Sequence, residues 1–425
     1  MLQIITGKFF TSDELNVTRQ RGVLYTNYEL NIFQKIETLS GTLLPVESWS
    51  DVPTLIYEVD QKLEAINKNG ERSFMIATHF DPLIQDFAAI ASFILEITCT
   101  PDIELTRRLT QSARHQVGVD QIPKQFITRV FDSRIQFAEG DEEKFQNFMK
   151  ELIGLERRKY EAAIRAIRRY VTGLHRIGDD VDLAYTLLVA SIESLAQEFD
   201  DFEPAWKDYD QNKREAINKA LKDASIETTQ KVQAAILAQE YTSLSRRFKE
   251  FTLAHLKPSF FREKAIEGKI SVSRTDLPVA LQEAYRFRSK YVHTLRELPK
   301  ILKTSPHHND TFEIFGKPIF TLQGLARIAK HTIKEFIYRG AKIDWEDYDY
   351  RSNLPNIVTG YRLAHRYWIW NPKGFTHKTA YRYLNGHLSE LSNVLMKEKG
   401  SQLTDLTEIL KEIENQIKGL ANYNL

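Results

Sequence analysis

The sequence has little cysteine, no long apolar run and almost no net charge. Cys99 is the only cysteine among 425 residues, which excludes an internal disulfide and a zinc site built from several thiolates, and favours a reducing compartment. The formal net charge is +1, so overall charge gives no argument for nucleic-acid binding, and such a role would need a local basic patch.

Segments typical of export, membranes or phosphate loops are also missing. The first residues, MLQIITGKFFTSDELN, lack a basic region followed by an apolar run and a cleavage site. The longest apolar run, near residues 87–99, is too short for a bilayer and contains Glu96. Neither G-x-G-x-x-G nor G-x-x-x-x-G-K-[ST] occurs. We therefore expect a cytoplasmic protein with no membrane partner.

The composition predicts a soluble chain of more than one domain, because single cores rarely grow past about 300 residues. Residues 1–139 alternate or cluster β-branched and aromatic residues between turns, for instance at 1–10 and 54–60. Residues 140–340 follow a helical pattern almost throughout, and residues 341–425 are aromatic-rich and then helical. We predict an α+β fold: a mixed α/β N-terminal domain (1–139), an all-α helical bundle (140–340) and a helical C-terminal extension (341–425).

Two stretches of the bundle carry basic residues in a helical pattern. Residues 142–177 predict one long amphipathic helix, whose arginines and lysines are interspersed with glutamates. A solvated helix face is therefore favoured over a nucleic-acid stripe. Aromatic and basic residues are interleaved after residue 341, where packing against a neighbouring domain is favoured over base stacking.

Residues 275–299 predict a single helix. Thr275 or Asp276 can cap its first N–H groups, and Pro278 stands where a missing N–H is tolerated. One apolar seam recurs at steps of three and four residues, through Ala280, Ala284, Phe287, Tyr291, Leu295 and Leu298.

Arg288 and His293 lie near the end of this predicted helix, with four residues between them. At about 100° per residue they fall on opposite flanks of the seam, and neither points into it. The arc opposite the core would carry Tyr285, Ser289 and Arg296, with Arg286 and Lys290 beside His293. A permanent cation next to a titratable imidazole suits an anion such as an RNA phosphate.

Other histidines give weaker patterns. Arg382 and His387 have the same spacing, but Asn385 and Gly386 interrupt that stretch, and we interpret it as coincidence. His79 with Asp81 lacks a cluster of further ligands, so it is read as a strand end and not as a metal site. His307 and His308 stand in a loop rich in Ser, Pro, Asn and Asp, and a solvated loop is expected. No metal or other cofactor is expected.

Ser191-Ile-Glu-Ser-Leu195 on one helix and Arg288 to His293 on another, within residues 140–340, resemble the HEPN superfamily. The likeness is greatest to the HEPN branch found in bacterial anti-phage and abortive-infection proteins. The resemblance implies a bundle of four or five helices that forms a homodimer, with one composite RNase site where the Arg/His helices of two protomers meet. It implies metal-independent endoribonuclease activity, by attack of the 2′-OH on the adjacent phosphate, in a toxin or anti-phage effector.

Under this resemblance, His293 is the predicted general base or acid and Arg288 the predicted phosphate clamp. Glu193 either orients Arg288 or is a solvated helix residue. Tyr285, Arg286, Ser289, Lys290 and Arg296 are predicted substrate contacts. RNA is the expected partner, together with a phage-derived trigger or a regulatory partner. Residues 1–139 and the C-terminal extension would be sensor or regulatory parts.

Two alternatives remain open. HEPN proteins often have Asn, Asp or His after the motif arginine, and Ser289 stands there instead. That departure, with the near-neutral charge, motivates a non-catalytic HEPN module that binds nucleotides or nucleic acid or acts as a scaffold. A metal-dependent enzyme that uses residues 307–331 or the N-terminal domain is the third reading, although no ligand spacing supports it.

Overall fold

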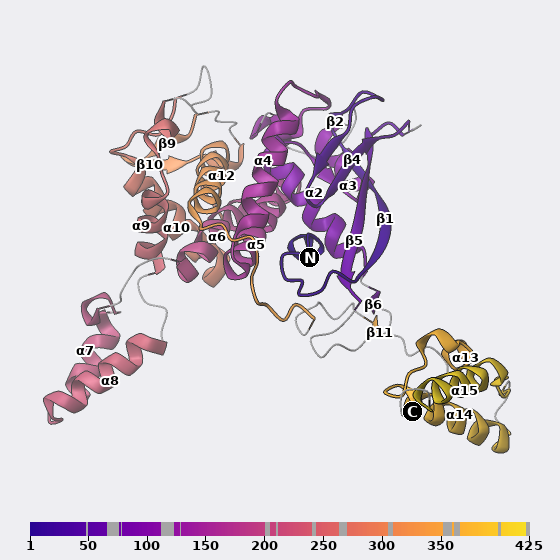
Figure 1. Cartoon of the computed structure of the whole chain (residues 1–425). Coiled ribbons are helices and arrows are strands. Elements are labelled where there is room, and N and C mark those ends of the chain that lie inside the picture. The colour runs from indigo at the N-terminus through magenta and orange to yellow at the C-terminus, as the bar shows by residue number, and fades with distance from the viewer. Residues whose placement is uncertain are drawn as a thin grey trace. The chain divides into compact units, whose positions relative to one another are not determined.

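The computed structural model combines an antiparallel sheet near the N-terminus with a larger helical part, which confirms the predicted α+β class (Figure 1). It describes residues 1–47, 50–65, 76–77, 79–111, 123–127, 129–199, 205–209, 211–239, 244–262, 270–304, 309–351, 359–360, 366–397 and 401–421. The chain divides into two compact units. The first comprises Met1–Glu64 and His79–Leu354, and the second comprises Ala65–Thr78 and Pro355–Leu425. The predicted boundaries at 139/140 and 340/341 both fall inside the first unit.

The sheet of the first unit has the order β3-β4-β5-β1-β7. Its strands are β1 (Leu15–Thr26), β3 (Ile36–Thr38), β4 (Gly41–Pro45), β5 (Thr54–Glu64) and β7 (Cys99–Thr100). β1 pairs antiparallel with β5 along eleven residues, with Val23 opposite Ile56. A separate parallel pair joins β2 (Tyr28–Glu29) to β8 (Ile135–Gln136).

Helix α2 (Asp81–Leu95) packs on this sheet and connects it to the helical part. The rings of Tyr57 on β5 and Phe87 on α2 stack at 4.1 Å, and a Cβ at Gly22 of β1 would collide with Phe80 and Ile84. On its other side α2 contacts α4 (Asp141–Gly154) and α5 (Arg157–Arg176). One continuous apolar core therefore serves the sheet and the helices.

The helical part is built around α5 and α6, which pack against each other. α12 contacts both of them, and α9 and α10 pack on α6 (Figure 1). The bounds are α6 (Val181–Phe199), α9 (Leu244–Ala254), α10 (Leu277–Thr294) and α12 (Leu322–Arg339). The remaining elements are α3 (Ile103–Thr110), α7 (Gln211–Ala220), α8 (Ile226–Gln239), α11 (Lys300–Thr304) and the hairpin of β9 (Thr311–Ile314) and β10 (Lys317–Phe320).

The single helix predicted over 142–177 is wrong, because the chain is extended at Leu155 and Glu156, where α4 ends and α5 begins. The break is held by residues from the start of the chain. The Lys8 ammonium donates to the carbonyls of Ile153, Gly154 and Leu155, at 3.0, 2.9 and 2.6 Å. These contacts satisfy carbonyls that a continuing helix would have bonded internally. A sequence window of this stretch cannot show them.

Residues 1–10 were expected to be a strand, and that expectation is wrong. Leu2–Ile5 form the short helix α1, and all four of its side chains are buried. An apolar run of this length fits either a buried strand or a buried turn of helix, and the tertiary contacts decide. Two of the aromatic residues after residue 341 pack on the N-terminal residues: Tyr348 lies against Phe9 and Tyr350 against Phe10, with ring centroids 5.2 and 5.6 Å apart. Trp345, Trp370 and Tyr381 are exposed.

The second unit contains the β6–β11 pair (Ile76–Ala77 with Thr359–Gly360), α13 (Arg366–Ile369), α14 (Ala380–Leu395) and α15 (Thr407–Ala421). Asn385 and Gly386 were expected to interrupt the stretch from Arg382 to His387, but both lie inside α14. Gly386 is buried because the helix passes close to Trp368, whose ring a Cβ would approach to 2.8 Å. The glycine therefore marks close packing here and not a helix end.

Candidate functional site

Helix α10 carries the predicted Arg/His pair, but it is shorter than predicted. It begins at Leu277, with Pro278 in its first turn, and buries Ala280, Leu281 and Ala284. It ends at Thr294 because Leu295 adopts the left-handed conformation, with φ 51° and ψ 28°. The expectation of one helix over 275–299 is therefore wrong at its C-terminal end. Leu295 does not join the apolar seam, and its side chain is 76% exposed.

The Arg288 guanidinium is held by a carboxylate from the neighbouring helix. Its Nη2 lies 2.7 Å from Oε2 of Glu193 on α6, and only 4% of the Glu193 side chain is exposed, against 19% for Arg288. Glu193 is thus a buried ion-pair partner and not a solvated residue. The Nε of Arg288 is also buried, and it makes no hydrogen bond within the described part of the chain. The ion pair therefore does not use the full donor capacity of this guanidinium.

Tyr285 belongs to the same buried cluster. Its hydroxyl donates to Oε1 of Glu193 at 3.0 Å, and the Arg288 guanidinium lies 5.7 Å from the centre of its ring. Burial and the adjacent Glu193 carboxylate raise the pKa of the Tyr285 hydroxyl, so it stays a neutral donor. The prediction that Tyr285 faces away from the core is wrong. The helical wheel was centred on Phe287, whereas the contact with α6 is centred nearer Ala284 and Arg288.

His293 lies five residues after Arg288, and its side chain is exposed. Five residues correspond to a rotation of about 140° around the helix axis, so the two side chains leave α10 in different directions. Within the part of the chain that the structure describes, His293 makes no hydrogen bond or ion pair. The exposed apolar side chains of Val292 and Leu295 lie on either side of it in sequence. One copy of α10 thus presents an imidazole to solvent beside apolar surface.

The other predicted contacts surround this end of the helix. Arg286 is exposed and pairs with the buried Glu283, and Ser289 and Lys290 are half-buried. Arg296 is exposed but lies beyond the end of α10, so the prediction that it shares the helical face is wrong. The surface around His293 therefore has basic side chains from both the helix and the segment after it.

Three aspartates stand at the start of α6, Asp179, Asp180 and Asp182, and we call them the acidic turn; the last two hold this end of α10. Asp180 caps α6, accepting from the Leu183 N–H at 2.9 Å, and it also accepts the Tyr291 hydroxyl at 3.4 Å. Asp182 accepts the Leu298 N–H at 2.5 Å and the Lys303 ammonium at 2.9 Å. The segment after α10 is therefore tied to α6.

Within the described residues, no group of three or more His, Cys, Asp and Glu side chains is placed to hold a metal ion. The His79 ring contacts Asp81 at 3.2 Å, between the end of β6 at Ala77 and the start of α2. His307 and His308 lie outside the described residues. Among the described helices, none combines the length and apolar character needed to cross a bilayer.

Comparison with known proteins identifies no relative of this chain. No protein-family model, no curated protein and no solved structure matches it. The geometry of α6 and α10 is therefore the basis for assigning a function.

Proposed function

We propose that this protein is a metal-independent endoribonuclease of the HEPN type, which acts in the cytoplasm as a toxin or anti-phage effector. One observation carries the proposal: the buried Glu193 carboxylate fixes the Arg288 guanidinium, and the same helix exposes His293. An oriented permanent cation and an accessible imidazole are the two groups that phosphodiester transfer without a metal requires.

The chemistry assigns each group a role. The RNA 2′-oxygen attacks the adjacent phosphorus and the bond to the 5′-oxygen breaks, leaving a 2′,3′-cyclic phosphate and a 5′-OH. In a dimer, the His293 imidazole of one copy removes the 2′-OH proton, and the protonated His293 imidazole of the other copy gives a proton to the leaving 5′-oxygen. Each imidazole can raise the rate about 10²–10⁴-fold. Arg288 stabilises the negative charge that develops on the phosphorane.

The geometry of α10 favours a site shared between two copies. Because Arg288 and His293 leave the helix about 140° apart, a single protomer does not direct both at one phosphate. Two α10 helices packed around a two-fold axis would bring the arginine of one copy towards the histidine of the other. The side chains of Val292 and Leu295, 47% and 76% exposed, supply apolar surface for such a contact.

A second candidate is supported by the burial of Arg288. With only 19% of its side chain exposed and a carboxylate 2.7 Å away, this arginine also suits a structural ion pair. The corresponding function is a non-catalytic HEPN module that binds nucleotides or RNA, or acts as a scaffold. In that case the basic residues around His293 bind a phosphate backbone without cleaving it.

RNA digestion separates the two candidates. End-labelled RNA is incubated in EDTA with the wild type, with His293→Ala and with Arg288→Lys, and the new ends are analysed. The matched controls are His377→Ala, an exposed histidine of the second unit, and Arg165→Ala, an arginine paired with Glu198 on α5 and α6. The endoribonuclease predicts cyclic-phosphate ends that both site variants lose and both controls keep.

Wild-type protein that binds RNA without producing such ends would favour the binding module. Cleavage that survives in His293→Ala would exclude the proposed mechanism. The biological role is tested separately, by comparing growth after induced expression, and phage plating efficiency, between the wild type and His293→Ala. A phage-derived trigger predicts cleavage that rises when phage lysate is added.

A further inference from the structure

A cavity of about 1150 Å³ lies in the first unit, away from the proposed α10 site. Three helices each turn one face towards it, and none of its lining residues belongs to α6 or α10. α2 contributes Asp81, Pro82, Gln85, Ala88 and Ala89; α3 and the residues beside it contribute Cys99 to Asp102, Glu104, Leu105, Arg107, Arg108 and Gln111; α5 contributes Arg168, Val171, Thr172, His175 and Arg176. Its volume is sufficient for a small organic ligand.

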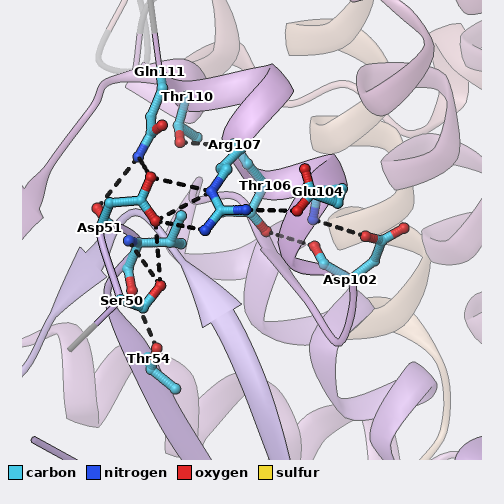
Figure 2. Close-up of polar contacts among 10 residues, drawn as sticks. Ser50, Asp51, Thr54, Asp102, Glu104, Thr106, Arg107, Thr110 and Gln111 are labelled. Atoms are coloured by element: carbon cyan, nitrogen blue, oxygen red, sulfur yellow. Dashed lines mark hydrogen bonds and ion pairs between the residues drawn. The ribbon is translucent and has the colours of Figure 1, made fainter. Parts of the chain in front are cut away.

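One wall is closed by ion pairs and offers little free charge. Figure 2 shows Arg107 between Asp51 and Glu104, with Gln111 also reaching Asp51. The Arg107 guanidinium contacts the Asp51 carboxylate at 2.8 Å and lowers the pKa of Asp51 to about 2. Asp102 accepts the Glu104 and Leu105 N–H groups at the start of α3 (Figure 2). The acidic groups at this wall are therefore already engaged as partners or as a cap.

Three half-exposed arginines also line the cavity. Arg108 from α3 and Arg176 from α5 share a single carboxylate, that of Asp179, at 3.8 and 2.8 Å. Among the described residues, two guanidinium groups thus share one carboxylate. Arg168 lies on the same face of α5, about two turns before Arg176. It pairs with the buried Asp86, and 48% of the Arg168 side chain is exposed.

Neutral groups also line the cavity. His175 lies between these arginines on the same face of α5, and burial together with Arg176 and Arg108 lowers its pKa to about 4. It is therefore an uncharged hydrogen-bonding group at neutral pH. The hydroxyls of Thr100 and Thr172 and the small side chains of Ala88 and Ala89 line the space next to it. These groups leave room for a ligand near the guanidinium groups.

We propose that this cavity binds a small phosphorylated molecule of nucleotide size. Arg108, Arg168 and Arg176 receive its phosphate, because guanidinium groups match phosphate oxygens in pairs of hydrogen bonds. The cavity is also lined by the carboxylates of Asp102, Glu104 and Asp81. A carboxylate can accept more hydrogen bonds than the present contacts of these groups use, so they accept hydrogen bonds from sugar hydroxyls or base amino groups. A ligand with a phosphate at one end and hydrogen-bond donors at the other can contact both the arginines and the carboxylates. An inorganic anion would contact only the arginines.

Calorimetric titration of the full-length protein tests the proposal. The probes are ADP, GDP, adenosine and inorganic pyrophosphate. We expect at least one diphosphate nucleotide to bind, pyrophosphate to bind more weakly and adenosine not to bind. The double variant Arg108→Ala/Arg176→Ala is expected to weaken nucleotide binding by at least about tenfold. Arg165→Ala, on α5 but outside the cavity, is the matched control and should leave the affinity unchanged.

A second variant keeps the test decisive if the double variant unfolds. Thr172→Phe places a bulky ring in the cavity without changing any charge, and it should abolish nucleotide binding with folding intact. The proposal is overturned if neither nucleotide nor pyrophosphate binds the wild type. It is also overturned if Thr172→Phe binds like the wild type, or if pyrophosphate binds as tightly as ADP and GDP. Because no α10 residue lines the cavity, these results are independent of RNA cleavage.

Discussion

The Glu193 carboxylate lies 2.7 Å from the Arg288 guanidinium and joins α6 to α10 in a largely buried ion pair. Removing one member of such a pair leaves the other charge without a partner in a site that excludes water. Glu193→Gln is expected to lower the free energy of unfolding by about 3 kcal/mol, measured by urea denaturation. The double variant Glu193→Leu/Arg288→Met should recover most of that loss, because no uncompensated charge remains.

The matched control for this prediction is Glu198→Gln. Glu198 pairs with Arg158 and Arg165, whose side chains are 68% and 54% exposed, so its loss should cost less than about 1 kcal/mol. Equal losses in Glu193→Gln and Glu198→Gln would show that the α6–α10 pair contributes no more than a surface pair.

Tyr285 tests whether the buried cluster depends on the hydroxyl that donates to Glu193. Tyr285→Phe keeps the ring but removes this donor, which bonds a charged acceptor at 3.0 Å. We expect the free energy of unfolding to fall by about 1–2 kcal/mol in thermal or urea denaturation. Tyr381→Phe, at a tyrosine that is 73% exposed, should change it by less than about 0.5 kcal/mol. If Tyr285→Phe is equally neutral, the hydrogen bond contributes nothing to stability.

Leu295 gives a prediction of opposite sign. It ends α10 with φ 51°, a conformation that costs free energy for any residue with a Cβ, and its exposed side chain gains little from burial. Leu295→Gly should therefore raise the free energy of unfolding by about 0.5–1 kcal/mol. Thr294→Gly, one residue earlier and still helical, should lower it. A loss of stability in Leu295→Gly would contradict the assignment of strain to this end of α10.

Lys8 is expected to be essential for the junction between α4 and α5. Lys8→Met keeps the apolar stem but leaves three buried or part-buried carbonyls without this donor. The free energy of unfolding should fall by about 2–4 kcal/mol, measured by urea denaturation. Lys62→Met, at an exposed position of β5, is the control and should be nearly neutral. A neutral Lys8→Met would mean that water or Gln3 satisfies these carbonyls equally well.

His175 predicts how stability depends on pH. Its pKa falls from 6.5 in the unfolded chain to about 4 in the folded protein, so between these values only the unfolded state is protonated. Its contribution is complete above pH 6.5 and is lost as the pH falls towards 4, by on the order of 3 kcal/mol at most. In chemical denaturation, His175→Gln should lose less stability than the wild type between pH 7 and pH 4. If the free energy of unfolding changed with pH equally in His175→Gln and in the wild type, the lowered pKa of His175 would be contradicted.

The sequence predicted the fold class and left open whether Glu193 contacts Arg288, but it did not predict the directions of all the side chains. Helical periodicity located α10 because it depends on local chain chemistry. Tyr285 was placed on the wrong face because a helical wheel needs a core direction, and Phe287 is only half-buried. The actual direction is set by Glu193, which lies 92 residues earlier in the chain.

The cavity and the break at residue 155 depend on contacts that no local pattern contains. Lys8 reaches carbonyls 145 to 147 residues away, and the cavity joins α3 with α5. Arg168 was considered only as part of a charged helix face, because its burial partner Asp86 lies on another helix. A signal did exist on α5, since residues 168, 171, 172, 175 and 176 share one helical face, but what they face is decided by α2 and α3.

Two neighbouring residues of the acidic turn contact two different parts of the protein. Asp179 holds the cavity arginines, and the next residue, Asp180, holds the Tyr291 hydroxyl of α10. An anion that draws Arg108 and Arg176 away from Asp179 frees one carboxylate directly beside the other. The free energy of ligand binding in the cavity would then depend on the position of the C-terminal end of α10. Any such coupling is reciprocal, so whatever restrains Tyr291 would change the affinity of the cavity by the same factor.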